Sequence, residues 1–402
     1  MIWEDYVFRR GIEVEELWDQ LFADRKKSGK PLRLLYVTGR GFDIRANAVL
    51  EKYVDRLIDS GCPIEKAELL LVGFSGYNLS TELHAQTAKN EAELKAAFEA
   101  IGSSNSIVIG ATAEGEDDIS STVALRRGAD EVLRNVSDQT DIVLDVSSLP
   151  RVAYLTILLS LLARILPDGK DGDGLHANGL SLQVLVAEDA ALDSKISSED
   201  PANDLTLIPG FSEALQSETQ SDEPLVWFPI LGENRLSQIV KLESSIPEWA
   251  EICPVLPHPS RNPRRGDQLL VEYESILFAK RDTPLSNILY ANESQPFEAY
   301  RQLLGAMMRY RKTMGIIGGC RMVVTPLASK LITVGSALAC YEMKVESADY
   351  RSSVAIPYAE PKRYEASVQS MLESRPVISA LLLTGEAYLN AESLAPAIVS
   401  AE

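Results

Sequence analysis

Runs of consecutive Val, Ile and Leu residues recur along the chain and alternate with longer amphipathic or polar stretches. Short continuous apolar runs are typical of parallel strands that helices cover on both faces. In a strand with one solvated face, apolar and polar residues alternate instead. The runs predict strands at 32–37, 69–74, 106–109, 141–146, 180–186, 225–230, 252–256, 287–290, 321–325, 354–358 and 377–383. Helical patterns lie between them, at 81–101, 119–135, 151–166, 234–246, 267–278, 297–313 and 330–341 among others.

This alternation predicts an α/β protein with two Rossmann-like halves, each a doubly wound, mostly parallel sheet. A chain of 402 residues is also too long for one ordinary core. The predicted domains are an N-terminal Rossmann-like domain at 1–186, an acidic insertion or linker at 187–224, and a C-terminal α/β domain at 225–402. The two halves echo each other, as an internal duplication of the β/α unit would produce.

The net charge is −19, from 39 basic and 58 acidic residues, and such a field repels phosphate backbones. We therefore expect no non-specific nucleic-acid binding. Ten acidic residues and one lysine lie between 187 and 223, a composition that cannot bury a large core of its own. The Gly/Asp-rich stretch at 168–179 is expected to be an exposed loop.

The four cysteines have neither metal-ligand nor disulfide-framework spacing, and the three histidines are scattered. We expect no metal and no bound cofactor. The first residues lack the pattern of a signal peptide. The longest uncharged apolar stretch, 152–163, has 12 residues and is too short to span a bilayer. A cytoplasmic protein without a membrane association is expected.

A first candidate site is the glycine turn Thr38-Gly39-Arg40-Gly41-Phe-Asp43, which follows a strand and precedes a helix. This is the setting of a phosphate-cradling turn. The alternative is a tight turn in which Asp43 caps the helix. An acidic residue would be expected after the second strand for NAD, but that strand ends in Phe74-Ser-Gly-Tyr77. The pattern therefore does not favour NAD.

A second candidate site is the turn Asp145-Val-Ser147-Ser148-Leu-Pro-Arg151, where a buried strand ends and an apolar helix begins. The carboxyl ends of parallel strands are where open α/β sheets bind ligands. A later strand ends in Thr325-Pro-Leu-Ala-Ser329-Lys330 and enters another apolar helix. A cation in the first turn of a helix opposes the helix dipole, unless an anion is bound there. The alternative is that Arg151 and Lys330 each pair with a nearby carboxylate.

The most unusual stretch is the loop Pro257–Asp267, which holds Arg261, Arg264 and Arg265 between prolines in an otherwise acidic chain. Guanidinium groups suit phosphate or carboxylate ligands. The alternative is a loop that docks on the acidic surface of its own chain. His258, between two prolines, is either a general base or a structural residue.

The spacing Asp145-x-Ser147 with Arg151 resembles the Asp-x-Thr…Lys turn of CARF domains, which sense cyclic oligonucleotides in prokaryotic defence. Two such units in one chain are similar to the SAVED domain. The family's paired glycines are replaced here by Ser148-Leu149, and the second turn lacks the leading aspartate. The resemblance implies a ligand-binding role for Ser147, Arg151, Ser329 and Lys330.

The leading hypothesis is a regulatory protein that binds a phosphorylated small molecule, such as a nucleotide, at the strand carboxyl ends and signals to a protein partner in antiviral defence. One alternative is an enzyme acting on a nucleotide or phosphate ester, with Asp43, Asp145 or His258 as acid, base or metal ligand. Another is a structural subunit whose acidic 187–223 segment docks a basic partner.

Overall fold

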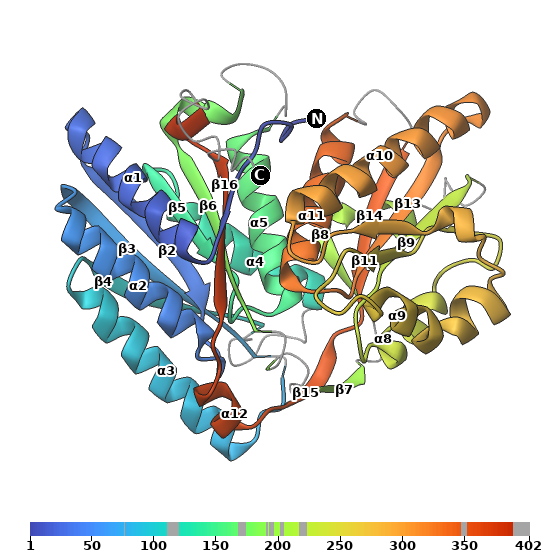
Figure 1. Ribbon diagram of the computed structural model, residues 1–402, viewed down its shortest axis with the longest axis horizontal. Helices are drawn as coiled ribbons and strands as arrows, with labels where there is room; N and C mark the ends of the chain where they lie inside the picture. The colour runs from blue at the N-terminus through green and yellow to red at the C-terminus, as the bar shows by residue number, and fades with distance from the viewer. Residues whose placement is uncertain are drawn as a thin grey trace, which may run out of the picture.

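The computed structural model describes residues 1–75, 77–110, 120–167, 174–189, 192, 197–201, 205–216, 223–346 and 352–388. Within these ranges the chain forms two sheets of seven strands each, and helices alternate with the strands. Figure 1 shows the sheets side by side, with helices α5 (Arg151–Ile165) and α11 (Lys330–Glu346) between them. The prediction of an α/β protein with two Rossmann-like halves is confirmed.

The first sheet holds the early part of the chain and the last described strand. Its strands lie in the order β1 (Val7–Arg10), β16 (Val377–Thr384), β6 (Ser181–Glu188), β5 (Asp141–Asp145), β2 (Leu32–Gly39), β3 (Ile64–Phe74) and β4 (Ser103–Ile109). The strands β2 to β6 pair in parallel, whereas β16 is antiparallel to both β6 and β1. The parallel strands therefore end at one common edge.

The second sheet repeats this arrangement. Its strands lie in the order β12 (Leu289–Ala291), β11 (Val255–Pro257), β9 (Leu225–Ile230), β13 (Cys320–Pro326), β14 (Ser352–Tyr358) and β8 (Thr206–Ser212), with β10 (Glu251–Ile252) also paired to β9. All pairs are parallel except β14 with β8. In both sheets the parallel strands follow the order third, second, first, fourth, fifth, which is the Rossmann-like order.

The antiparallel edge strands are exchanged between the halves. After β6 the chain reaches β8, which pairs with β14 of the second sheet. After β14 the chain reaches β16, which returns to pair with β6 of the first sheet. The two sheets therefore do not follow the boundaries drawn from the sequence, because β8 comes from the expected acidic linker and β16 from the expected C-terminal domain. The exchange ties the two halves together.

Helices cover both faces of the first sheet. The other α-helices with bounds in the described part of the chain are α1 (Ile12–Ser28), α2 (Arg45–Ser60), α3 (Thr81–Glu99), α4 (Ser121–Arg134), α7 (Glu213–Gln216), α8 (Leu236–Glu243), α9 (Arg265–Glu272), α10 (Pro296–Met314) and α12 (Val368–Leu372). Alternate residues of β2 face opposite ways: Leu34 and Tyr36 pack with α1, α2 and α3, whereas Leu35 and Val37 pack with α4 and α5. Burial on both faces explains the uninterrupted apolar runs in the sequence.

The core around α5 continues into the second half. Leu155, Leu158 and Leu162 of α5 belong to the same apolar cluster as Leu331 and Leu338 of α11. The phenol of Tyr341 in α11 donates hydrogen bonds to the carbonyl oxygens of Leu162 and Leu166 at the end of α5. The two helices that follow the fourth strands therefore form one of the contacts between the halves, beside the contacts of α4 and α5 with β8.

Two smaller features complete the described fold. Strands β7 (Ser197–Pro201) and β15 (Pro361–Glu365) form a separate antiparallel pair. Residues 174–179 of the predicted glycine-rich loop form a 3-10 helix, and its residues 168–173 lie outside the described ranges. None of the described helices combines the length and the apolar character that crossing a bilayer requires.

Candidate functional site

Two loops at the carboxyl ends of the fourth strands face each other across the halves. We call residues 145–151, after β5, the first turn, and residues 325–330, at the end of β13, the second turn. The guanidinium of Arg151 in the first turn donates hydrogen bonds to the carbonyl oxygens of Pro326 at 2.8 Å and Ala328 at 2.5 Å in the second turn. The first half thus reaches into the second at this point.

The second turn returns the same kind of contact. The ammonium of Lys330 donates to the carbonyl oxygen of Val146 at 2.8 Å and also to that of Ser147, both in the first turn. From the sequence, two partners remained possible for each of these cations: a bound anion or a nearby carboxylate. Arg151 instead binds main-chain carbonyl oxygens of the opposite turn. Lys330 also binds carbonyl oxygens of the opposite turn, and its charge favours the ionised forms of the nearby Asp43 and Asp145, so the carboxylate alternative holds in part for Lys330. This exchange joins the halves.

The first turn holds a buried carboxylate, Asp145, whose side chain is 0% exposed. Its oxygens accept hydrogen bonds from the main-chain N–H of Ser147 at 2.9 Å, the hydroxyl of Thr38 at 3.2 Å and the phenol of Tyr36 at 3.4 Å. Burial raises the pKa of Asp145 to about 6, although the hydrogen bonds from Ser147 and the charge of Lys330 oppose the rise. This carboxyl group therefore titrates close to neutral pH.

The glycine turn after β2 packs directly on the first turn. The hydroxyl of Ser148 donates to the carbonyl oxygen of Gly39 at 3.0 Å. A Cβ atom at Gly39 would lie 2.6 Å from the Oγ of Ser148 and 2.8 Å from its carbonyl carbon, so only glycine fits. Gly41 comes nearly as close, because its Cβ atom would lie 3.2 Å from the carbonyl oxygen of Ser148. Arg40 instead lies against Glu91 of α3, with 2.5 Å between Nε and Oε2.

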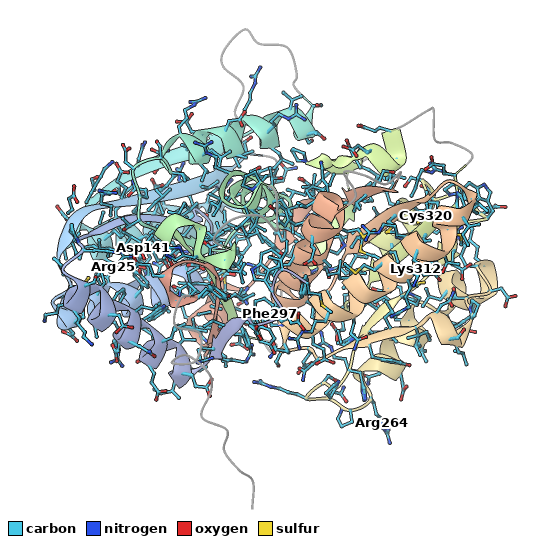
Figure 2. All side chains as sticks on the ribbon, turned by 90° about the horizontal axis from the view of Figure 1, so that it is seen from above. Arg25, Asp141, Arg264, Phe297, Lys312 and Cys320 are labelled. Carbon is cyan, nitrogen blue, oxygen red and sulfur yellow. The ribbon has the colours of Figure 1, made fainter. Side chains whose placement is uncertain are left out.

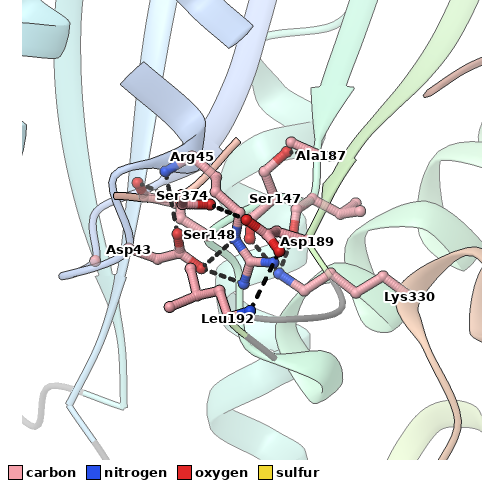
Figure 3. A network of polar contacts seen from close by, with 12 residues as sticks. Asp43, Arg45, Ser147, Ser148, Ala187, Asp189, Leu192, Lys330 and Ser374 are labelled. Atoms are coloured by element: carbon pink, nitrogen blue, oxygen red, sulfur yellow. Dashed lines mark hydrogen bonds and ion pairs between the residues drawn. The ribbon is translucent and has the colours of Figure 1, made fainter. Parts of the chain in front are cut away.

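Asp43 forms a buried ion pair with Arg45, a residue that the sequence analysis missed. The Arg45 Nη2 atom lies 2.6 Å from Asp43 Oδ2, and the Arg45 N–H donates to Asp43 Oδ1 at 3.0 Å. Burial opposes ionisation of Asp43, but Arg45 and the nearby Lys330 outweigh it and keep its pKa below the ordinary value. Figure 3 shows this pair in the same group of polar contacts as Ser147 and Lys330. Asp43 therefore binds the first residue of α2, but it is not the N-cap that the alternative expected, because Ile44 occupies that position.

The second turn lacks a carboxylate at the equivalent place. The buried hydroxyl of Thr325 accepts a hydrogen bond from the indole N–H of Trp227 at 2.9 Å. Ser329 accepts from the N–H of Ile332 at 3.5 Å, in the first turn of α11. Glu188, at the end of β6 in the first half, accepts from the N–H of Leu331 at 3.1 Å. A carboxylate from the other half thus meets the positive end of the α11 dipole.

The arginine-rich loop lies in the second half, and Figure 2 shows Arg264 at its rim. Arg265 is bound by two acids of its own half, with 2.8 Å from Nη2 to Glu233 and 2.6 Å from Nη1 to Glu293. For this arginine the alternative of pairing with the chain's own acids is therefore correct. Arg264 and Arg261 are exposed, and their main-chain N–H groups donate to Asn262 and Glu293.

Arg261 nevertheless comes near the edge of the site. Burial lowers the pKa of Arg10 at the end of β1, and the Arg261 guanidinium lowers it further. Arg10 lies 3.8 Å from Glu188, the residue that binds the start of α11. His258 packs edge-on against Tyr290, with 5.7 Å between the ring centres. This contact fits the structural alternative for His258.

Several polar atoms beside the two turns are buried without a hydrogen-bond partner in the described part of the chain. They include Arg151 Nε, the phenol oxygen of Tyr154 and the hydroxyl of Thr333. These three groups are neighbours: burial raises the pKa of Tyr154, and contacts with Arg151 and Thr333 oppose the rise. The Arg151 guanidinium also lies over the ring of Tyr358, 5.5 Å from its centre. Buried polar groups are nearly always paired, and the side chains of Arg151, Tyr154 and Thr333 supply polar neighbours to one another beside the two turns.

Metal binding finds no support in the described ranges, where no group of three or more His, Cys, Asp or Glu side chains is placed to hold an ion. Arg45, Glu188, Tyr154 and Thr333 were missed in the sequence. Only the Asp43-x-Arg45 spacing at a helix start offered a signal, because the other contacts join residues far apart in the chain.

Comparison with known proteins gives no relative to draw on: no protein-family model matches the chain, and no curated protein sequence is similar to it.

Proposed function

We propose that this protein is a regulatory ligand sensor that binds a phosphorylated small molecule, with nucleotides as the first class to test, between the first and second turns. The observation that carries the proposal is the reciprocal contact in which Arg151 and Lys330 each cross from one half to the other. Both cations thereby lie at one junction, at the strand ends where open α/β sheets bind their ligands.

The Arg151 guanidinium donates to main-chain carbonyl oxygens. A carbonyl oxygen carries only a partial charge, whereas a phosphate oxygen is ionised and forms hydrogen bonds roughly twice as strong. An anionic ligand at the junction replaces the carbonyl oxygens of Pro326, Ala328 and Val146 as the partner of Arg151 and Lys330. The hydroxyl groups of Tyr154 and Thr333, which neighbour Arg151, supply further donors beside it.

Ligand binding at this place changes how the halves meet. Each cation now ties its own half to the opposite turn, so a ligand that takes both cations weakens one set of contacts and bridges the halves by another. The difference in affinity for the two arrangements is what shifts the equilibrium between them. A partner protein whose affinity depends on the packing of α5 against α11 then binds more tightly or more weakly when the ligand is bound.

The resemblance of the first turn to CARF domains, and of the paired arrangement to the SAVED domain, agrees with this proposal. CARF domains and the SAVED domain have the Rossmann-like layout in common with this chain. Cyclic oligonucleotides and a role in antiviral defence are therefore the first ligand and the first setting to examine.

The test is a calorimetric titration of the full chain with AMP, ATP, cyclic AMP, a cyclic dinucleotide and a cyclic oligoadenylate, at low and at moderate salt. We expect saturable binding of at least one of them. Lys330→Met should weaken it by about tenfold or more, because a charged hydrogen bond is lost. Arg264→Met, an exposed arginine of the same chain, should leave it unchanged. Absence of heat with every compound at both salt concentrations contradicts the proposal.

A further inference from the structure

A cavity lies at the opposite end of the first sheet from the two turns. It has a volume of about 420 Å³ and is bordered by α1, by the first residues of β2, β5 and β6, and by the end of β16. Strand β5 begins with Asp141 at the cavity and ends with Asp145 at the first turn. A strand rises about 3.3 Å per residue, so about 13 Å separates the two places. The cavity is therefore a separate site.

One wall of the cavity is aromatic and firmly packed. Trp18 and Phe22 of α1 both meet Tyr53 of α2 edge-on, with ring centres 5.2 and 5.4 Å apart. All three side chains are at most 4% exposed. An aromatic wall that is already held in place binds a flat apolar ring without a further ordering cost.

The charges at the cavity are largely matched. Arg25 Nη2 lies 2.6 Å from Asp141 Oδ2, and Figure 2 shows the two residues together on the outer side of the first half. Lys30 pairs with Glu386, another residue of the cavity wall, at 2.5 Å. The charged residues of the cavity lining are the two cations Arg25 and Lys27 and the three acids Asp24, Asp141 and Glu386, so the cavity offers no net attraction for a phosphate or a carboxylate. An uncharged ligand fits this balance.

Gln183 supplies one directed donor. The indole N–H of Trp18 donates to Gln183 Oε1 at 3.1 Å, and because an indole N–H can only donate, this contact fixes which way the amide faces. The Gln183 Nε2 atom is then buried without a hydrogen-bond partner in the described ranges, and Gln183 is 4% exposed. It needs an acceptor, which no atom in the described part of the chain supplies.

The carboxylate of Asp141 lies on the same face of the sheet. Asp141 pairs with Ser181 and Val143 with Gln183, so Asp141 and Gln183 are diagonal neighbours on β5 and β6. Diagonal neighbours lie about 7–8 Å apart, within reach of one small ligand. The site thus offers an N–H donor and a carboxylate acceptor beside an aromatic wall.

We propose that this cavity binds an uncharged aromatic molecule that carries an amide or lactam group. Its carbonyl oxygen accepts from Gln183 Nε2, its N–H donates to Asp141, and its ring packs against Trp18 and Tyr53. This class includes aromatic carboxamides and nucleobases with a lactam. The site is independent of the ligand proposed for the two turns.

The test uses benzamide and benzoate, which have the same shape but differ in charge and in the N–H donor. Ligand-observed NMR titration of the full chain should give saturable benzamide binding, with a dissociation constant on the order of 1 mM for so small a molecule. Benzoate should bind about tenfold more weakly or not at all. No saturable benzamide binding, or equal binding of benzoate, overturns the proposal.

Three variants locate the binding. Gln183→Glu keeps an oxygen for Trp18 but loses the donor, so benzamide should bind about tenfold more weakly. Leu21→Trp fills the cavity from a half-buried position of α1 and should abolish binding. Ile12→Trp, on the same helix at a position that is 67% exposed, should change nothing. Circular dichroism and thermal unfolding check the fold, and benzamide binding by a folded Leu21→Trp protein as tight as that of the unchanged chain overturns the proposal.

Discussion

The first and second turns occupy equivalent places in two sheets of the same strand order, yet they carry different chemistry. In the first half, Tyr36 pairs with Val143 across β2 and β5 and donates to Asp145, two residues further along. In the second half, Trp227 pairs with Val323 across β9 and β13 and donates to Thr325, again two residues further along. In both halves, an aromatic side chain on the first parallel strand thus donates a hydrogen bond to a side-chain oxygen on the fourth parallel strand.

The acceptor differs in its charge. Asp145 is a buried carboxyl group whose pKa burial raises to about 6, whereas Thr325 is a neutral hydroxyl. One layout thus serves two purposes: the second turn holds its strands together, and the first turn also holds a carboxyl group whose pKa is raised to about 6. Any pH dependence of the junction should therefore arise in the first half.

The largest expected effect is the removal of this pH dependence by Asp145→Asn. A carboxyl group with a higher pKa in the folded than in the unfolded chain favours folding while it is protonated. Its contribution is complete below its ordinary pKa of 3.8 and is lost as the pH rises through about 6. A shift of this size corresponds to about 3 kcal/mol.

The free energy of unfolding of Asp145→Asn should therefore rise relative to that of the unchanged chain between pH 4 and pH 7, by up to about 3 kcal/mol. Urea denaturation at a series of pH values measures this difference. A difference that stays constant with pH would mean that Asp145 titrates as an ordinary aspartate, and the contrast between the turns would fail.

Arg151→Met should have the next largest effect. It leaves the carbonyl oxygens of Pro326 and Ala328 without their donor, at a cost of about 2–3 kcal/mol in the free energy of unfolding. Urea denaturation at pH 7 measures it. A cost below about 0.5 kcal/mol, the usual range for surface substitutions, would show that the reciprocal contact does not join the halves.

Thr325→Val should have a smaller effect that does not depend on pH. It removes the acceptor of the buried Trp227 indole N–H, which costs about 1–2 kcal/mol. The same denaturation series from pH 4 to pH 7 checks both the size and the constancy. A loss that changes with pH in parallel with that of Asp145→Asn would indicate that the turns are chemically alike.

The smallest effects belong to the arginine-rich loop. Arg265→Met should cost about 1 kcal/mol, because Arg265 is only 21% exposed and binds two carboxylates. Arg264→Met, at an exposed position, should stay within about 0.5 kcal/mol. Thermal or urea unfolding of both variants side by side would test this order, and the reverse order would mean that the ion pairs of Arg265 do not stabilise the loop.

Much of the fold could be predicted, because strands buried on both faces leave continuous apolar runs. The run at 321–325 became β13, and that at 377–383 became β16. The run at 252–256 is divided between β10 and β11. Four of the described strands were missed. The strand β1 is only four residues long and ends in two arginines, β7 and β8 lie within an acidic stretch whose average composition hides them, and β15 is a five-residue strand with three charged residues.

The exchange of edge strands could not be predicted from local pattern. An antiparallel edge strand has the same sequence signature whichever sheet it joins, and β16 pairs with a strand almost two hundred positions earlier. For the same reason the domain boundaries drawn from composition followed the chain and not the sheets.

The candidate site was predicted in part. Arg151 and Lys330 stand out in the sequence because a cation is unfavourable at the start of a helix. Their partners are main-chain carbonyl oxygens, which every residue carries, so no side-chain pattern could reveal them. Glu188 binds the N–H of Leu331 from 143 positions away, and only the fold brings these two together.

The most direct test of the account is a calorimetric double-mutant cycle on Arg151→Met and Lys330→Met, with the nucleotide that binds the unchanged chain most tightly. If one anion bridges both turns, each single variant should weaken binding by about tenfold or more, with a coupling of about 1 kcal/mol between them. Unchanged affinity in both folded variants would contradict a ligand shared by the two turns.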